Sequence, residues 1–385
     1  MGFGRIVELA QRADTRFQRW RDPESRAVLL NARTPMNYAV MAPIHRAMEK
    51  DPRVKFYYMA SESPERTHEI YREAPEAESL NPRRAATMKF DAYLAADLLW
   101  AMLPRGTPRI QMFHGVAGKY GRVYDRPDRS MRAWDRLFFI NRKRMKNFIA
   151  AGAIDPDSRA ARLVGMPKLD CLLDGSLERD SVLSALGLDP ARRTVLYAPT
   201  WSPYSSLNAM GEELVARLTE RGYCVIVKLH DRSRDPEFVH SGGVDWIARL
   251  EPMLSSCSGM FATGSDACPY MAAADLLITD HSSVGFEYLL LDRPVVRIEM
   301  PELIAQTDIH PDYVELLASA SRSARTACEA VEAVERELSE PASRSATRKQ
   351  VASELFYEPG TATCRAVREL YEVLELDPAS VRTSI

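Results

Sequence analysis

Short apolar runs recur along the chain, and the segments between them carry apolar residues at helical spacing. The runs are residues 27–30, 54–59, 90–95, 109–113, 137–140, 194–197, 224–229, 259–263, 276–279 and 294–298. Runs such as 137–140 and 276–279 contain no charged residue and are typical of strands buried on both faces of a parallel sheet, and others, such as 54–59 with Lys55, are mainly apolar. Strands that alternate with helices predict open parallel sheets covered by helices on both faces.

The helical segments complete this α/β pattern. They are residues 37–50, 97–103, 141–151, 211–221, 269–274 and 283–291, and a helical tail from about residue 312 that breaks near Pro341 and Pro359. A polar stretch, 174–193, separates two such series, and 385 residues is long for a single core. We therefore predict two Rossmann-like, doubly wound domains that face a cleft, residues 1–185 and 186–385, the second with the helical tail.

Composition adds an expected location. The net charge of −2, with 46% hydrophobic and 27% charged residues, describes an ordinary globular protein. No apolar run approaches the roughly 20 residues of a membrane-spanning helix, and the N-terminus lacks the apolar core of a secretory signal. The six cysteines include no Cys-x-x-Cys pair, so we expect neither a metal site nor a disulfide framework. These features favour a cytoplasmic protein.

Two basic segments suggest contacts with anionic partners. Residues 3–21 form a basic amphipathic stretch, which either docks as a helix on its own protein or lies on an anionic membrane. Residues 119–146 contain ten basic residues against three acidic ones. This second segment is either a solvated face or a surface for an acidic acceptor polymer or for anionic lipid headgroups. Aromatic residues suited to base stacking are sparse, so we expect no nucleic acid partner.

The residues after run 276–279 carry the richest candidate chemistry. Small and polar residues follow the run directly, and a helical pattern begins near Ser283. Ser282 and Ser283 therefore lie at a predicted helix N-terminus, where free backbone N–H groups and the helix dipole favour a phosphate or pyrophosphate. Alternatively, Ser283 only caps its own helix. Glu287 lies one position too late for a capping box, which leaves it and the second serine unexplained by capping.

Three other predicted strands also end in polar residues. His114, followed by Gly115, is either a general base, since its ordinary pKa suits neutral pH, or a structural hydrogen-bonding group. Thr200 either donates to a phosphate or base edge or lies in a plain turn. Lys228 and His230 point the same way at a spacing of two, so both could reach one anionic group. Alternatively, Lys228 and His230 bind no ligand and lie at a solvated strand end.

Several sequence motifs that would indicate other chemistries are missing. The sequence has no Gly-x-Gly-x-x-Gly fingerprint, no phosphate loop and no Gly-x-Ser-x-Gly elbow. Its only Asp-x-Asp, residues 155–157, has a proline at the centre and favours a turn. Kinase, hydrolase and metal-dependent transferase functions are therefore disfavoured, and no metal or cofactor is expected.

Five motifs together resemble the CDP-glycerol glycerophosphotransferase family, the teichoic-acid primases and polymerases of bacterial cell walls. They are His114-Gly115 with Lys119, Gly165-x-Pro167-Lys168-x-Asp170, Tyr197-Ala198-Pro199-Thr200-Trp201, Lys228-x-His230, and Thr279-Asp280-His281-Ser282-Ser283 with Glu287-Tyr288. The resemblance covers about residues 90 to 300. It implies a GT-B fold with an acceptor-side first domain and a nucleotide-donor-binding second domain. It also implies transfer of glycerol phosphate from CDP-glycerol to a hydroxyl of a glycan or lipid-linked acceptor, with release of CMP.

The same resemblance implies roles for individual residues. His114 would deprotonate the acceptor, and His230 would be a second essential histidine near the phosphates. Ser282 and Ser283 would hold the pyrophosphate, with Glu287 nearby. The other predicted substrate-binding residues are Gly115, Lys119, Thr200, Trp201, Lys228 and Asp280.

The chain also departs from the family pattern. Leu229 and Asp231 stand where the family usually has prolines, His281 where tyrosine is frequent, and Glu287 where aspartate is frequent. These departures leave CDP-ribitol or another CDP-polyol open as the donor. The chain lacks a long extension, so we expect a compact enzyme of cell-envelope synthesis that makes a single transfer. We also expect it at the inner face of the cell membrane, as a peripheral protein.

Two other functions are also compatible with the sequence. The first is another GT-B-type nucleotide-sugar enzyme, either a glycosyltransferase or a UDP-sugar 2-epimerase. The second is a non-catalytic nucleotide-binding module that docks on membranes through its basic segment. The presence of both His114 and His230 favours an enzyme, because a binding module needs no proton acceptor.

Overall fold

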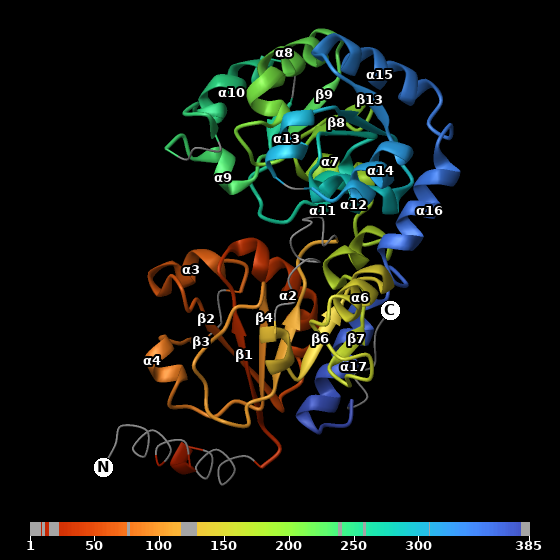
Figure 1. Ribbon diagram of the computed structural model, residues 1–385. Helices are drawn as coiled ribbons and strands as arrows, with labels where there is room; N and C mark the ends of the chain where they lie inside the picture. Colours follow the sequence, from red (N-terminus) through yellow and green to blue (C-terminus); the bar gives the residue numbers. More distant parts are fainter. Residues whose placement is uncertain are drawn as a thin grey trace. The chain divides into compact units, whose positions relative to one another are not determined.

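The computed structural model describes residues 9, 12–14, 23–74, 78–116, 129–237, 241–256, 259–307 and 309–378. The chain forms two compact units, each built on its own parallel sheet (Figure 1). The first unit comprises residues 1–114, 126–170 and 357–385, and the second comprises 115–125 and 171–356. Two parallel sheets with flanking helices confirm the predicted α/β class.

The sheet of the first unit has seven strands in the order β3-β2-β1-β4-β5-β6-β7. Their bounds are β1 (Arg26–Asn31), β2 (Val54–Met59), β3 (Glu78–Ser79), β4 (Ala92–Ala96), β5 (Arg109–Met112), β6 (Arg136–Phe139) and β7 (Ala161–Leu163). All neighbours are parallel, so the carboxyl ends of the strands lie along one edge. The apolar runs predicted β1, β2, β4, β5 and β6. Strands β3 and β7 are short and contain charged residues, which is why no apolar run marked them.

The helices of the first unit cover its apolar strands. They are α2 (Pro35–Met48), η1 (Pro64–Arg66), α3 (Thr67–Ile70), α4 (Pro82–Ala85), η2 (Arg129–Ala133), α6 (Arg142–Ala150) and α17 (Ala362–Leu374), with η3 (Pro167–Leu172) at its end. Helix α2 begins at a cap that the sequence supplies: the Thr34 hydroxyl accepts the N–H of Asn37, and Pro35 occupies the first turn. Its buried side chains, Val40 and Ile44 among them, enter the core of this unit.

The C-terminal helix α17 belongs to the first unit, which differs from the predicted division at residue 185. Leu370 and Leu374 of α17 are buried in the core of the first unit, where blue α17 lies in Figure 1. The Tyr371 hydroxyl also donates to Asp51 Oδ2 at 3.0 Å. The apolar stripe of a helical tail shows that it is buried but not against which core, so the sequence could not assign it.

The sheet of the second unit has six strands in the order β10-β9-β8-β11-β12-β13, all parallel. Their bounds are β8 (Thr194–Tyr197), β9 (Cys224–Val227), β10 (Met260–Phe261), β11 (Leu276–Thr279), β12 (Val295–Ile298) and β13 (Arg322–Ala324). Strands β8 and β11 have the predicted bounds, because each is buried along its whole length. Strand β13 lies in the segment predicted to be wholly helical, which is wrong at this point.

The second unit contains the remaining helices. They are α7 (Arg179–Ala185), α8 (Ser206–Glu220), α9 (Asp231–Arg234), α10 (Trp246–Ser256), α11 (Cys268–Ala273), α12 (Ser283–Tyr288), η5 (Leu289–Leu291), α13 (Pro301–Gln306), α14 (Pro311–Ala320), α15 (Ala327–Ser339) and α16 (Ser345–Leu355). Helix α7 lies inside the polar stretch predicted as the junction, and Arg179 ties it to this unit through Asp275 Oδ2 at 2.9 Å. The predicted breaks near Pro341 and Pro359 separate α15, α16 and α17.

The segment 97–103 is not the predicted helix. Asp97 and Leu98 both have positive φ, at 60° and 54°, which begins a turn after β4. Leu99 is buried, but Trp100 and Met102 are exposed, so the apolar composition reflects an irregular loop. Among the described residues, no helix has the length and apolar character needed to cross a membrane.

Much of the basic sequence lies outside the described residues. Of the amphipathic stretch 3–21, only residues 9 and 12–14 are described, and they are helical. Lys119 and the rest of 117–128 are likewise outside the described part of the chain.

Candidate functional site

His114 lies at the carboxyl edge of the first sheet beside a carboxylate that the sequence did not indicate. Strands β4 and β5 are parallel neighbours, with Ala96 opposite Met112, so the residues that follow them meet at this edge. There, His114 Nδ1 pairs directly with Asp97 Oδ1. Asn37, in the first turn of α2, donates from Nδ2 to Asp97 Oδ2 at 2.8 Å. The adjacent strand exits therefore form an Asn37–Asp97–His114 cluster.

The charge of this cluster is set by its hydrogen bonds. Burial favours the neutral form of Asp97, but the hydrogen bond and charge of His114 and the hydrogen bond from Asn37 outweigh it. The net pKa of Asp97 is below its ordinary value, so the carboxylate is ionised at neutral pH. The His114 side chain is 42% exposed, which leaves part of the imidazole accessible to a reactant. Gly115 follows, and a Cβ placed there would meet no atom within 4 Å.

Asp97 was missed because it sits inside an apolar sequence. The surrounding residues, 92–103, read as a strand followed by a helix, and an isolated aspartate between them gives no pattern. Its position carried the signal: Asp97 lies two residues after the predicted strand 90–95, and the next predicted strand, 109–113, directly precedes His114. Adjacent strands in a parallel sheet bring such residues together.

In the second unit, Asp280 follows β11 and forms hydrogen bonds with residues that follow β8 and β11. Its Oδ1 accepts the N–H of Thr200 at 2.8 Å and that of His281 at 2.6 Å. Its Oδ2 accepts both the N–H and the hydroxyl of Ser206, each at 3.0 Å. The side chain is buried, and both oxygens are used within the protein. The structure thus gives Asp280 a role in holding the β8 and β11 loops, and direct substrate contact by it stays a prediction.

Thr200 and Trp201, at the exit of β8, have contrasting surroundings. The Thr200 hydroxyl is buried and has no hydrogen-bond partner among the described residues. The half-buried Trp201 ring lies 5.6 Å from the His230 ring between centroids. The guanidinium of Arg232 lies over the same indole at 4.4 Å. The exits of β8 and β9 therefore bring Trp201, His230 and a cation together.

Lys228 and His230 follow β9, which ends at Val227. Lys228 is half-buried, and its Nζ donates to Leu229 O at 3.1 Å. His230 is exposed and caps α9, with Nδ1 accepting the N–H of Arg232 at 3.2 Å. The capping contact requires Nδ1 to be unprotonated, so any proton on the neutral ring is on Nε2.

Ser282 and Ser283 begin α12 directly after β11. Ser282 is the capping residue, but its side chain makes no capping hydrogen bond. Both serines are half-buried. The alternative in which a serine hydroxyl is used up by capping is therefore not what the structure shows. Glu287 is buried in α12, so its contact with a substrate stays a prediction.

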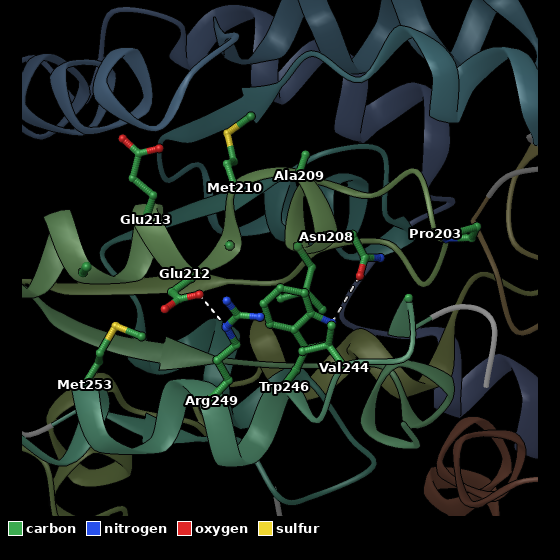
Figure 2. A pocket seen from close by; sticks show the side chains of 14 residues that line it. Pro203, Asn208, Ala209, Met210, Glu212, Glu213, Val244, Trp246, Arg249 and Met253 are labelled. Atoms are coloured by element: carbon green, nitrogen blue, oxygen red, sulfur yellow. Dashed lines mark hydrogen bonds and ion pairs between the residues drawn. The ribbon is translucent and has the colours of Figure 1, made fainter. Parts of the chain in front are cut away.

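A separate cavity of about 670 Å³ lies between α8 and α10. Figure 2 shows two pairs among its polar side chains, Arg249 with Glu212 and Trp246 with Asn208. Arg249 Nε lies 2.5 Å from Glu212 Oε2, and Trp246 Nε1 donates to Asn208 Oδ1 at 3.2 Å. None of the predicted site residues lines it. Elsewhere in the described ranges, no group of three or more His, Cys, Asp or Glu side chains is placed to hold a metal ion.

Two parallel sheets with polar residues at their strand exits define a GT-B-like α/β protein. The chain belongs to the CDP-glycerol:poly(glycerophosphate) glycerophosphotransferase family, whose model matches residues 16–372. The family resemblance stated from the motifs is thereby confirmed, and the match extends beyond the residues that carried it.

Individual relatives are more distant. A teichoic acid poly(glycerol phosphate) polymerase from Staphylococcus epidermidis is 26% identical over 187 residues, or 46% of this chain. The match spans 24% of that relative's length. The wall teichoic acid polymerase TagF has a similar fold, with a TM-score of 0.67, 17% identity, and coverage of 92% of this chain and 90% of TagF. A UDP-N-acetylglucosamine 2-epimerase from Listeria monocytogenes, whose assignment is provisional, also has a similar fold. Its TM-score is 0.60 and its identity 15%, with coverage of 92% of this chain and 98% of the epimerase.

Proposed function

We propose that the protein is a glycerophosphotransferase that transfers a polyol phosphate, in the simplest case glycerol phosphate, from CDP-glycerol to an acceptor hydroxyl. The acceptor is a cell-surface glycan or a lipid-linked precursor of one. The observation that carries this proposal is the pairing of His114 with Asp97 in a chain of this family. A TagF variant soaked with CDPG has the same fold, at a TM-score of 0.65 and 16% identity over 91% of this chain and 89% of TagF.

The proposed reaction is an in-line displacement at the β-phosphorus. The acceptor oxygen forms a bond to this phosphorus, and the bond from the phosphorus to the bridging oxygen breaks. CMP leaves with that oxygen and its electron pair, while the acceptor proton passes to His114. Base catalysis of this kind contributes about 10²–10⁴ in rate. The glycerol phosphate is then joined to the acceptor through a phosphodiester.

The predicted substrate-binding residues would hold the diphosphate and the leaving group. The hydroxyls and backbone N–H groups of Ser282 and Ser283 can donate to phosphate oxygens. Lys228 supplies positive charge as CMP departs, and His230 supplies a donor. The Thr200 hydroxyl is a further donor, and Trp201 offers an aromatic face. Glu287 and Lys119 keep the substrate-binding roles that the resemblance implies.

We also propose contact with an anionic membrane surface, where a lipid-linked acceptor would be found. In the first unit, Trp100 is 51% exposed and Met102 is 83% exposed. Arg105 of the same loop is exposed, and so is Arg132 of the neighbouring segment, which pairs with Asp155 at 3.0 Å. Exposed Trp and Met beside basic side chains suit the interface of an anionic bilayer. By this proposal the protein works at the inner face of the cell membrane.

Release of CMP from CDP-glycerol is the direct test. We expect His114→Gln to release CMP on the order of 10²–10⁴ times more slowly than the wild type. His68→Gln is the matched control, because His68 is an exposed histidine of the same unit. Unchanged turnover in His114→Gln would remove this histidine from the chemistry. Failure of the wild type to release CMP with every polyol donor and acceptor would favour a non-catalytic nucleotide-binding module.

A second candidate, a UDP-sugar 2-epimerase or related nucleotide-sugar enzyme, is favoured only by the shared fold. The two functions predict different nucleotides. CMP and CDP-glycerol should raise the melting temperature if the proposed function is correct, and UDP should not. The opposite pattern would favour the nucleotide-sugar enzyme.

A further inference from the structure

We propose that Asp97 is the positioning residue for His114 and that, together with Asn37, it makes Nε2 the nitrogen that takes the acceptor proton. This inference deepens the proposed function and rests on it for its kinetic consequence. The structural part is independent, since it concerns only where the ring of the free protein carries its hydrogen.

The Asp97 carboxylate is presented by a strained turn. Leu99 N–H donates to Ala96 O at 3.3 Å, which closes a four-residue turn after β4. Its two central residues, Asp97 and Leu98, both have positive φ, which costs free energy in any residue other than glycine. Aspartate tolerates this conformation better than most residues, whereas leucine does not. A turn that keeps a leucine in this region must be held by its surroundings.

Buried side chains from neighbouring elements hold the turn. The amide oxygen of Gln111, on β5, accepts the N–H of Leu98 at 2.8 Å. The hydroxyl of Tyr93, on β4, donates to Leu99 O at 2.5 Å. Gln111 and Tyr93 are both fully buried. Hydrogen bonds from β4 and β5 therefore fix the backbone around Asp97, so the carboxylate is held in one orientation.

Asn37 fixes the carboxylate itself, and its own orientation is determined by the backbone. The N–H of Arg33 donates to Asn37 Oδ1 at 3.2 Å. The amide oxygen is thus on the Arg33 side, which places the NH₂ group toward Asp97 Oδ2 at 2.8 Å. Asp97 Oδ1 is left for His114 Nδ1. An ionised carboxylate can only accept, so Nδ1 carries the hydrogen and Nε2 of the neutral ring has the free lone pair.

This series of hydrogen bonds means that Asp97→Asn tests the tautomer of His114 directly. Asparagine tolerates positive φ as well as aspartate does, so the turn should be kept. Its amide oxygen must face the Asn37 NH₂ group, which turns its own NH₂ group toward His114. Nδ1 must then accept, and the hydrogen moves to Nε2, where it blocks proton uptake. The variant should reverse the tautomer without changing the fold.

The first readout is the ¹⁵N spectrum of the imidazole nitrogens, recorded on the free protein at a pH where the ring is neutral. His114→Gln identifies the His114 signals. We expect unprotonated Nε2 in the wild type and protonated Nε2 in Asp97→Asn. Asp135→Asn is the matched control, because Asp135 accepts the N–H of Arg109 at the opposite end of β5. An Nε2-protonated ring in the wild type would overturn the inference, whatever the activity.

The second readout is CMP release. Asp97→Asn should lower kcat on the order of 10²-fold or more, up to the full effect of the base, with the KM for CDP-glycerol nearly unchanged. The double variant with His114→Gln should be no slower than His114→Gln alone, because the two side chains act as one unit. The positioning role would be overturned if the reductions in kcat of the two single variants multiplied in the double variant. It would also be overturned if the kcat of Asp97→Asn lay within twofold of the wild-type value. Inactivity of the wild type with the expected tautomer would instead overturn the proposed function.

Discussion

The carboxylate of Asp280 accepts the backbone N–H of Thr200 at 2.8 Å, joining the exits of β11 and β8. The same side chain accepts from Ser206, at the start of α8, through its other oxygen. An acidic residue at a strand exit is easily assigned to a substrate, as the sequence led us to do. In this structure both carboxylate oxygens accept hydrogen bonds from the protein itself, so Asp280 holds the loops after β8 and β11, and its contact with a substrate stays a prediction.

Asp280→Asn should therefore weaken both the fold and the donor site. Asparagine has one acceptor oxygen, so one set of buried N–H donors would lose its partner, at a cost of about 1–3 kcal/mol. We expect a lower free energy of unfolding in urea and a CDP-glycerol Kd raised about tenfold or more. Asp275→Asn is the control, because Asp275 accepts from Thr194 at the opposite end of β8. Equal effects of the two variants on the Kd would contradict a local role for Asp280.

Thr200→Val should separate ligand binding from stability. The buried hydroxyl has no partner in the described part of the chain, so its removal should leave the free energy of unfolding unchanged or higher. If the hydroxyl donates to a phosphate, CMP or CDP-glycerol should bind on the order of tenfold more weakly, about 1.4 kcal/mol. Thr279→Val is the contrasting variant, because its hydroxyl donates to Ala198 O at 2.7 Å. Thr279→Val should lower the free energy of unfolding. Unaltered ligand affinity in Thr200→Val would exclude Thr200 from the site.

Elements buried on all sides were the most predictable from the sequence. Strands β8 and β11 are continuous apolar runs, and the chemistry at their ends follows from the rule that parallel strands present ligands at their carboxyl edge. His114 could be found in the same way, from its place after an apolar run. The bounds of β8 and β11 were therefore predicted correctly, and the roles of the polar residues that follow them stay predictions.

Relationships that depend on packing between distant segments could not be predicted. The sequence shows an apolar stripe in α17 but not that Leu370 joins the core of the first unit. Strand β13 is three residues with an arginine and a serine, and its pairing to β12 has no local signature. Asp97 lacks a pattern because its conformation depends on Gln111, which lies on the next strand and accepts the N–H of Leu98.

The exposed loop of the first unit predicts vesicle binding. We expect the protein to sediment with vesicles that contain anionic lipid, and to release as salt screens the charges. Met102→Asp should weaken this binding about tenfold or more, because burying a methionine side chain is worth about 1.5–3 kcal/mol. Leu173→Asp, at a 42% exposed leucine of the second unit, should bind like the wild type. Identical sedimentation of both variants, or none by the wild type, would rule out this loop as the contact.

His45 should make the stability of the first unit depend on pH. It is buried, with Nε2 2.6 Å from the Tyr58 hydroxyl and Nδ1 3.0 Å from the Tyr38 hydroxyl. Burial lowers its pKa below the ordinary 6.5, against the attraction of Glu49, which is 3.7 Å away. The unfolded chain therefore binds a proton at a pH where the folded chain does not. Stability from this group is complete above pH 6.5 and falls as the pH drops below it, toward the lower pKa of the folded state.

The measurement is the free energy of unfolding in urea at a series of pH values from 8 down to 5. His45→Gln should be less stable at pH 8, because it loses packing, but its stability should fall less steeply below pH 6.5 than that of the wild type. The exposed His68→Gln should retain the wild-type slope. Because carboxylates also titrate near the lower end of this range, the difference between the two variants carries the test. Parallel curves for His45→Gln and the wild type would show that the buried imidazole does not couple folding to protons.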